Sequence, residues 1–364
     1  MSSIRSLPRH LAIAYAALLV YACLHPLSGW QSSGLPVFDY LIAPWPKYFS
    51  VDDLILNIAG YIPLGLTIAS ALPRGWSKKR GIAATVLFAA LLSFCLETIQ
   101  GFLPTRTASN IDIAANAVGA CIGAVIGARW RQALFAPQRG VARWRARHIT
   151  DGFTGDAGLI LLALWLLAQI TPDHLLFAGG DLRRLLGIAP PLPFQAGRLI
   201  AFEAMQTASI MLAVGLFARC ILRVAGPFWA IMLLLLGIGA RTLASALFFV
   251  PSDPLAWLTP GTGRGLIAGS LLLVAALRLS RVAQHSLAGA SLLVSTALIN
   301  LMPESPYFLD NDHAILNRGN YPNFYGLSHL VAALWPLAAL AYLSAFGLWQ
   351  GERLENRHDY HGHP

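Results

Sequence analysis

The chain has 364 residues, of which 56% are hydrophobic and 12% are charged, whereas soluble domains contain about 25% charged residues. This composition excludes a soluble protein of this size. The formal net charge of +9 would favour nucleic-acid binding only if the basic residues formed a patch on a solvated surface, and here they lie between apolar runs. We therefore expect no nucleic-acid partner, and we interpret the basic excess as a signal of membrane topology.

Ten apolar segments follow one another along the chain, most of them near the length of about 20 residues that a membrane-spanning helix needs. They are residues 11–28, 53–72, 82–102, 111–130, 157–172, 199–221, 227–250, 264–280, 286–302 and 328–349. Proline residues lie near the ends of several segments, as helix-breaking residues should. The sequence predicts an all-α fold, a polytopic helical transmembrane bundle with about ten spans.

Lys and Arg residues are concentrated in alternate connecting segments. Cytoplasmic segments of membrane proteins keep an excess of these residues. If the N-terminus is inside, the inside segments contain 18 of the 26 Lys and Arg residues. Both termini are therefore predicted to be cytoplasmic.

A basic stretch, residues 131–156, separates the first four apolar segments from the last six. We interpret it as a cytoplasmic linker that lies on anionic lipid headgroups. The predicted domains are a four-helix membrane domain at 1–130, this linker, a six-helix membrane domain at 157–350 and a cytoplasmic tail at 351–364.

Three of the predicted spans carry pairs of polar residues near the same, outer membrane boundary. The pairs are Asp53 and Asn57, Glu97 and Gln100, and Asp112 and Asn116. Each pair is three or four positions apart and so lies on one helix face. Arg106, in the turn between the third and fourth spans, is expected beside Glu97 and Asp112. Because ionisable residues inside spans mark functional sites, we predict a site formed by these seven residues.

The fourth span continues its polar face with glycine at every fourth position, Gly119, Gly123 and Gly127. Such a stripe lets another helix approach closely. The polar end of this span is therefore expected inside a bundle, in one of two roles. It forms either an internal ion-pair network or a pocket in which Arg106 binds a carboxylate or phosphate through two parallel hydrogen bonds.

These residues resemble the VanZ-like family of bacterial membrane proteins. The matching pattern is N…P-x-G…E-x-x-Q…R…D-x-x-x-N-x-x-G, from Asn57 to Gly119, and the resemblance covers roughly residues 12–130. The namesake of the family is associated with low-level resistance to the glycopeptide teicoplanin. The resemblance implies a multi-pass protein of the bacterial plasma (inner) membrane with a role in the cell envelope, and it does not extend to the six further spans.

Five residues of the C-terminal half are secondary candidates: Glu203, Arg241, Arg264, His313 and His329. Arg241 lies deep in its span, so we expect it to pair with a carboxylate, with Glu203 as the best candidate. Arg264 follows a glycine-rich loop that either binds an anion through backbone N–H groups or is a plain tight turn. His313 lies in a loop rich in aromatic and polar residues, and His329 begins the last span.

The four cysteines lie inside apolar segments without C-x-x-C spacing, and no recognised catalytic signature is present. We expect no disulfide, no metal site and no cofactor. Our first hypothesis is a non-enzymatic protein that binds or moves an outside-facing anionic amphiphile. Its partner would be membrane lipid, a lipid-linked cell-wall intermediate or a glycopeptide-type antibiotic.

Two other functions fit the same residues. The first is an intramembrane enzyme in which Glu97 and Asp112 act as general acid and base, or bind a divalent cation, on a phosphorylated lipid headgroup. The second is a structural membrane scaffold in which the polar residues only hold the helices together.

Overall fold

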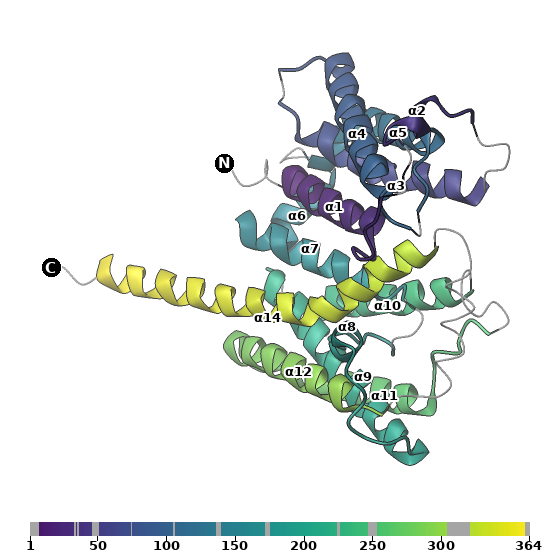
Figure 1. Ribbon diagram of the computed structural model, residues 1–364. Helices are drawn as coiled ribbons and strands as arrows, with labels where there is room; N and C mark the ends of the chain where they lie inside the picture. Colours follow the sequence, from purple (N-terminus) through teal and green to yellow (C-terminus); the bar gives the residue numbers. More distant parts are fainter. Residues whose placement is uncertain are drawn as a thin grey trace. The chain divides into compact units, whose positions relative to one another are not determined.

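A computed structural model (Figure 1) describes most of the chain. The described residues are 7–32, 34, 36–45, 51–73, 75–104, 106–135, 140–171, 175–223, 226–246, 253–303 and 321–360. Among the predicted site residues, His313 lies outside these ranges. Regular structure in the described residues is helical, apart from an isolated bridge between Ile149 and Leu222. The predicted all-α fold is confirmed.

The chain divides into two compact units, each of which is described by itself. The N-terminal unit comprises Met1–Arg147, Asp151–Asp156 and Asn317–Leu327; the C-terminal unit comprises His148–Thr150, Ala157–Leu316 and Ser328–Pro364.

The helices follow the predicted apolar segments closely. The first six are α1 (Leu7–Leu24), α2 (Asp39–Ile42), α3 (Val51–Ala71), α4 (Lys78–Gln100), α5 (Asn110–Phe135) and α6 (Gly140–His148). The others are α7 (Gly152–Ala168), α8 (Arg183–Leu186), α9 (Ala196–Ile221), α10 (Phe228–Ala244), α11 (Pro260–Ala276), α12 (Arg281–Leu301) and α14 (Tyr321–Tyr360). Within the described residues, seven helices are long and apolar enough to cross a membrane. They lie in α1, α3, α4, α5, α9, α12 and α14. The chain is therefore a multi-pass helical membrane protein, while the count of ten spans and the cytoplasmic termini stay predictions.

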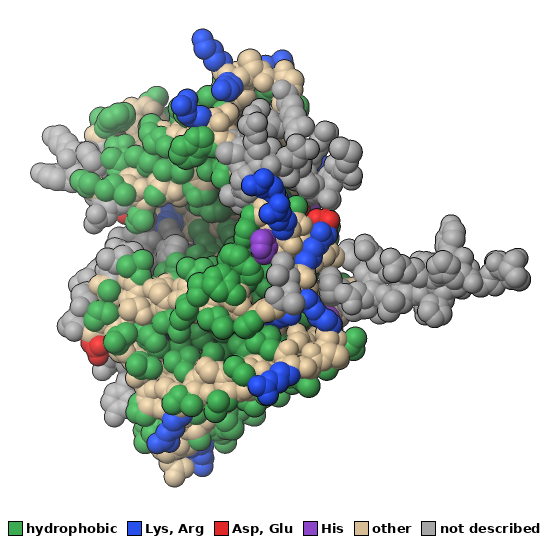
Figure 2. Space-filling model, turned by 180° about the vertical axis from the view of Figure 1, so that it is seen from behind, with side chains coloured by type: hydrophobic (Ala, Val, Ile, Leu, Met, Phe, Trp, Pro, Cys, Tyr) green, Lys and Arg blue, Asp and Glu red, His purple; other side chains and the backbone are tan. Residues whose placement is uncertain are grey.

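Both units expose large apolar side chains, as lipid-facing helices do (Figure 2). On α4 the side chains of Leu87 and Leu91 are more than half exposed, and so are those of Ile267 and Leu271 on α11. In water such surfaces would mark an interface or an aggregation site. In a bilayer they contact acyl chains at no cost.

The predicted linker is more ordered than the sequence suggested. It contains the end of α5, all of α6 and the start of α7. Arg145 of α6 is buried and forms an ion pair with Asp156, whose other carboxylate oxygen lies 2.8 Å from Nδ1 of His10 in α1. This part of the stretch therefore packs against its own unit through Arg145 and does not present that residue to lipid headgroups.

Helices α3 and α5 of the N-terminal unit pack backbone against backbone. A Cβ atom at Gly119 or Gly123 of α5 would collide with the carbonyl oxygen of Ile58 or Ile62 in α3, and one at Gly127 would lie 2.7 Å from Leu66 O. Gly65 of α3 makes the reciprocal approach to the backbone of α5. The close approach predicted from the glycine stripe is confirmed, and the partner helix is α3.

A second glycine stripe lies where the sequence suggested a loop. Residues from Pro260 onward form α11, which begins with Thr259 as N-cap and proline at its first position, a favoured helix start. Gly261 packs against Glu203 of α9, and a Cβ atom at Gly265 would lie 2.7 Å from Ala204 O. The prediction of a glycine-rich loop is therefore wrong, because these glycines belong to α11 and pack it against α9.

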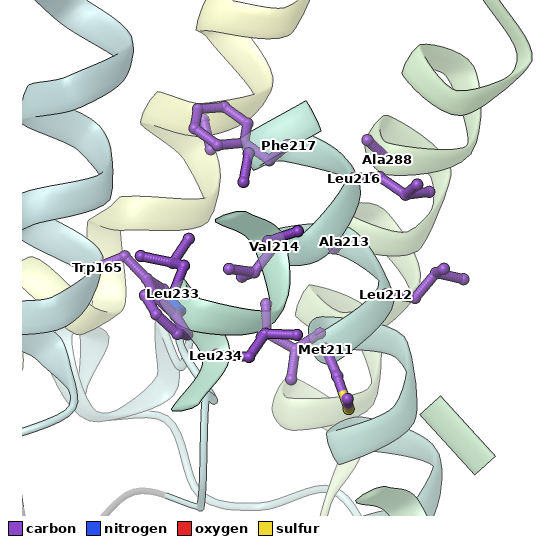
Figure 3. Packing of buried hydrophobic residues seen from close by; sticks show 14 of the residues in the cluster. Trp165, Met211, Leu212, Ala213, Val214, Leu216, Phe217, Leu233, Leu234 and Ala288 are labelled. Atoms are coloured by element: carbon purple, nitrogen blue, oxygen red, sulfur yellow. The ribbon is translucent and has the colours of Figure 1, made fainter. Parts of the chain in front are cut away.

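The core of the C-terminal unit surrounds α9 (Figure 3). Val214 and Phe217 of α9 are fully buried, and Leu234 of α10 and Trp165 of α7 belong to the same cluster. Rings meet at both ends of the cluster: Trp165 lies 5.4 Å from Phe177 and Phe217 lies 5.7 Å from Trp335 between centroids. Helix α9 is therefore the central helix of this unit.

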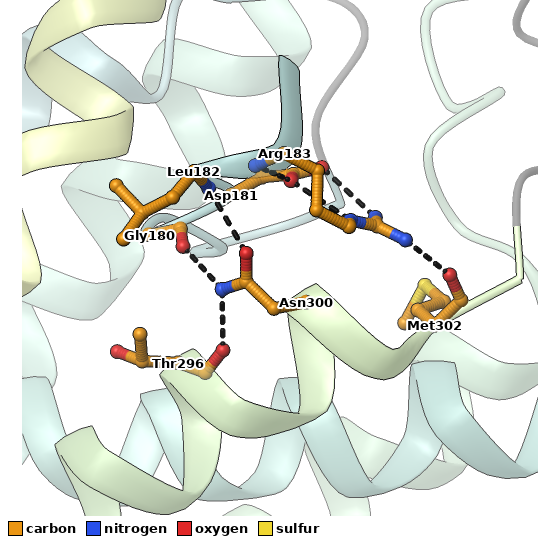
Figure 4. Close-up of polar contacts among 7 residues, drawn as sticks. All are labelled: Gly180, Asp181, Leu182, Arg183, Thr296, Asn300 and Met302. Atoms are coloured by element: carbon orange, nitrogen blue, oxygen red, sulfur yellow. Dashed lines mark hydrogen bonds and ion pairs between the residues drawn. The ribbon is translucent and has the colours of Figure 1, made fainter. Parts of the chain in front are cut away.

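A buried segment without helical structure, residues 175–182, is held by α12 and α14. Pro336 interrupts the hydrogen bonding of α14 because it has no N–H for the carbonyl of Ala332, and Gly180 N donates to that carbonyl at 2.9 Å instead. Asn300 of α12 donates to Gly180 O at 2.6 Å and accepts from Leu182 N at 3.1 Å (Figure 4). Irregular backbone is tolerated at membrane depth only when protein groups satisfy it in this way.

Replacing Gly123 with alanine tests the α3–α5 packing. We expect Gly123→Ala to lower the free energy of unfolding by about 1–3 kcal/mol, because the added methyl group forces the two backbones apart. Gly60→Ala is the matched control, since its Cβ atom meets open space and alanine favours the helix. Thermal unfolding in detergent measures both, and equal melting temperatures for the two variants would contradict the packing account.

Replacing Asn300 tests the support of the buried segment. Asn300→Leu leaves Gly180 O and Leu182 N without their side-chain partner, and we expect a loss of about 1–3 kcal/mol for each such group that stays buried. The control is Gly289→Ala on the same helix, where the added atom meets open space. A melting temperature of Asn300→Leu as high as that of the control would refute this role.

Candidate functional site

The candidate site lies where three helix ends meet in the N-terminal unit: the start of α3, the end of α4 and the start of α5. The short turn between α4 and α5 returns the chain at the same end of the bundle. The close α3–α5 packing then holds the first turns of α3 and α5 together. Every one of the seven predicted site residues is on one of these three helices or in the turn.

Asn57 joins α3 to α5. Its Nδ2 donates a hydrogen bond of 2.7 Å to Oδ1 of Asp112. Both residues lie on the packed faces of the two helices, Asn57 one position before Ile58 and Asp112 seven before Gly119, whose backbones meet. The structure therefore brings together the polar faces of α3 and α5 that carry Asn57 and Asp112.

Glu97 joins the end of α4 to the start of α5. Its carboxylate is buried, with 6% of the residue exposed, and its Oε2 accepts a hydrogen bond of 3.0 Å from the backbone N–H of Ser109. Ser109 directly precedes α5, so this bond fixes the turn that contains Arg106.

Arg106 is half-buried in that turn, and Glu97 and Asp53 are the acidic residues that act most strongly on its charge. Burial lowers the pKa of the guanidinium, and the two carboxylates oppose this change. Arginine has an ordinary pKa above 12, so Arg106 stays charged. Asp112 accepts a hydrogen bond from Asn57, and its predicted place beside Arg106 stays a prediction.

The other two amides also connect helices. Gln100 Nε2 donates to the backbone carbonyl of Cys23 in α1 at 2.7 Å, and Asn116 Nδ2 donates to Ser93 Oγ of α4 at 2.9 Å. Hydrogen bonds of this kind hold membrane helices together. The amides thus have a packing role that the sequence treated as the alternative to ligand binding.

Three carboxyl groups and one guanidinium make up the ionisable part of the set. Glu97 and Asp112 interact as like charges, and so do Asp112 and Asp53. With every group ionised, negative charge would exceed positive charge in a half-buried place. A ligand at this site therefore meets one cation, Arg106, close to carboxyl groups.

A segment that the sequence analysis did not single out covers this end of the bundle. Tyr40 of α2 shares a hydrogen bond of 2.8 Å with Thr98 of α4, and Asn110 Nδ2 donates to Ala43 O at 2.8 Å. The side chains that follow are exposed and apolar: Ile42 is 85% and Trp45 is 68% exposed. We call residues 36–45 the rim. Its aromatic content, which is typical of the membrane interface, was the only sequence signal for it.

Within the part of the chain that the structure describes, no group of three or more His, Cys, Asp or Glu side chains is arranged to hold a metal ion.

The described secondary candidates belong to the C-terminal unit. Glu203 is buried, and its Oε2 accepts a hydrogen bond of 2.7 Å from the hydroxyl of Thr259, the N-cap of α11. Arg241 is buried in α10, Arg264 is exposed on α11 and His329 is half-buried in α14. The structure thus gives Glu203 a hydroxyl partner, and its predicted pairing with Arg241 stays a prediction.

A double-mutant cycle tests the bond between Asn57 and Asp112. We expect Asn57→Ala and Asp112→Ala to be coupled by about 0.6 kcal/mol and by no more than about 1.7 kcal/mol, the average and the largest value for hydrogen bonds between membrane helices. Thermal or denaturant unfolding in detergent gives the three free energies. The control combines Asn57→Ala with Thr85→Ala, near the other end of α4, and the losses of unfolding free energy of these two variants should add. If the losses of Asn57→Ala and Asp112→Ala also add, the hydrogen bond contributes nothing to stability.

One comparison with known proteins found a match to part of the chain. No curated protein and no solved structure matches the chain. The helices that form the site are contained in one family match, which spans a third of the chain. Residues 12–131 match the VanZ/LLP1 family.

Proposed function

We propose that the N-terminal unit binds an outside-facing amphiphile in the bacterial plasma (inner) membrane and holds an anionic group of that ligand on Arg106. The observation that carries the proposal is the position of Arg106. It is half-buried at the end of the helix bundle, in a turn fixed by the bond from Ser109 N to Glu97. A fixed guanidinium binds a phosphate or carboxylate through two parallel hydrogen bonds.

The surroundings of Arg106 favour an amphiphile over a small water-soluble anion. The exposed apolar side chains of the rim, with Ile42 and Trp45 the most exposed, suit contact with acyl or polyprenyl chains. An anionic headgroup at Arg106 and an apolar chain on the rim describe a lipid-linked cell-wall intermediate or a glycopeptide-type antibiotic with an acyl chain. Binding such a molecule would connect the site to antibiotic resistance.

The other polar residues act through Arg106 and the helices in this proposal. Glu97 and Asp53 favour the charged form of the guanidinium. Asn57, Gln100 and the Nδ2 group of Asn116 hold the helices, because each already bonds to another helix. Loss of these groups should therefore affect stability as well as binding, whereas loss of Arg106 should affect binding of the anionic group most strongly.

Arg106→Gln tests the proposal. The probe is a polyprenyl phosphate added to the purified chain in detergent, with the uncharged polyprenol as the comparison ligand, and native mass spectrometry measures retention. We expect wild type to retain the phosphate at least about ten-fold better than the alcohol, and Arg106→Gln to lose this preference, because a charged hydrogen bond contributes about 1.5–3 kcal/mol.

Arg80→Gln is the control, since Arg80 is exposed at the opposite end of α4. In cells with equal membrane abundance of each variant, Arg106→Gln should change the susceptibility to teicoplanin relative to wild type, whereas Arg80→Gln should not. Equal retention of phosphate and alcohol by wild type, or an Arg106→Gln variant that behaves like Arg80→Gln, would overturn the proposal.

A further inference from the structure

Helix α6 directs its arginine side chains to two opposite faces. Arg145 is buried and forms an ion pair with Asp156, whereas Arg143 and Arg147 are exposed. At 3.6 residues per turn, Arg143 and Arg147 lie on one face with Trp144 beside them, and Arg145 lies on the other. We call Arg143, Trp144 and Arg147 the outer face of α6. The ion pair of Arg145 therefore fixes which side of α6 points away from the rest of the N-terminal unit.

The same ion pair holds α6 beside the start of an apolar span. Asp156 binds Arg145 of α6 and Nδ1 of His10, and His10 lies in the first turn of α1, a helix long and apolar enough to cross a membrane. The other end of α1 lies at the candidate site, where Gln100 donates to the carbonyl of Cys23. Helix α6 is therefore at the end of the bundle opposite to the candidate site.

The end of α5 adds a second pair of basic and aromatic side chains at this end of the bundle. Arg129 and Trp130 are exposed, Trp130 by 55%, and Trp144 of α6 is 36% exposed. Tryptophan is enriched at the level of the lipid headgroups because its ring is apolar and carries one polar N–H group. Asp151, just before α7, is the exposed carboxylate of residues 129–156. The exposed charge of this stretch is therefore mainly basic.

Contacts within the protein stabilise only the inner side of α6. The helix has nine residues, fewer than the about 12–15 that an isolated helix needs in water. Arg143 and Arg147 form no ion pair with any residue that the structure describes. They are four positions apart, and like charges at this spacing repel each other and weaken a helix. An anionic surface against the outer face would remove this repulsion.

We propose that the outer face of α6 binds the anionic phospholipid headgroups of the membrane leaflet at this end of the bundle. Each guanidinium forms charged hydrogen bonds to a headgroup phosphate, and the ring of Trp144 lies at headgroup level. A lipid surface fits better than a nucleic acid or an acidic protein, because α6 is held beside the start of a span and carries an exposed tryptophan between its basic residues. The inference does not depend on the proposed function, since α6 and the candidate site lie at opposite ends of α1.

Hydrogen–deuterium exchange of α6 tests this inference. The full chain is placed in nanodiscs of phosphatidylcholine with or without phosphatidylglycerol of the same acyl chains, and mass spectrometry follows the backbone amides of residues 140–148. We expect exchange to be at least about ten-fold slower with phosphatidylglycerol at low salt, because each basic residue near an anionic surface contributes a factor of about five. High salt should reduce the difference. Equal exchange in the two nanodiscs at low salt would overturn the inference.

A charge-removing double variant separates lipid binding from folding. Arg143→Gln combined with Arg147→Gln changes exposed side chains, so it should keep the melting temperature and lose the response of α6 to phosphatidylglycerol. Arg143→Glu combined with Arg147→Glu should exchange faster with phosphatidylglycerol than without it. The control removes the same charge from two exposed arginines of the C-terminal unit, by Arg264→Gln combined with Arg278→Gln, and should respond like wild type.

The remaining outcomes also decide the inference. If phosphatidylglycerol slows exchange equally in wild type and in the double glutamine variant, the outer face does not bind the headgroups and the inference fails. If phosphatidylglycerol has no effect but a short DNA duplex or polyglutamate slows exchange of α6, the outer face binds another kind of partner and the lipid surface is refuted. Arg106→Gln should respond to phosphatidylglycerol like wild type, so failure of the proposed function would leave this inference standing.

Discussion

The backbone contact between α3 and α5 is the constraint on which the N-terminal site depends. Gly119 and Gly123 allow the backbone of α5 to touch the carbonyl groups of α3, an approach that any side chain would prevent. Membrane helices gain little from apolar burial, so such close van der Waals packing supplies much of the driving force for their association. The same contact brings the first turns of both helices together, and with them Asn57 and Asp112.

The polar groups at this end of the bundle divide into two kinds. Asn57 and Gln100 are committed to bonds between helices, and Glu97 is committed to the turn before α5. Arg106, in the turn between α4 and α5, is the group to which the proposed ligand would bind. This division explains how one cluster of residues can satisfy both interpretations that the sequence left open, a packing network and a binding site.

Much of the fold and part of the site could be predicted from the sequence. The apolar segments fixed the long helices, and the spacing of Asp112, Asn116 and Gly119 fixed the face on which α5 packs. Periodicity cannot identify the residue on the neighbouring helix, so the bond from Asn57 to Asp112 could not be predicted from the spacing. The glycine stripe of α11 was taken for a loop because three glycines beside a proline resemble a turn. The rim at residues 36–45 has no helical pattern long enough to detect.

An experimental density map of the chain purified with its bound lipid tests the central claim most directly. The account predicts density for an anionic headgroup in contact with the guanidinium of Arg106, continuous with an apolar chain along the rim that contains Ile42 and Trp45. A map in which the Arg106 guanidinium contacts protein groups alone, with lipid density confined to the outer faces of the helices, would contradict it.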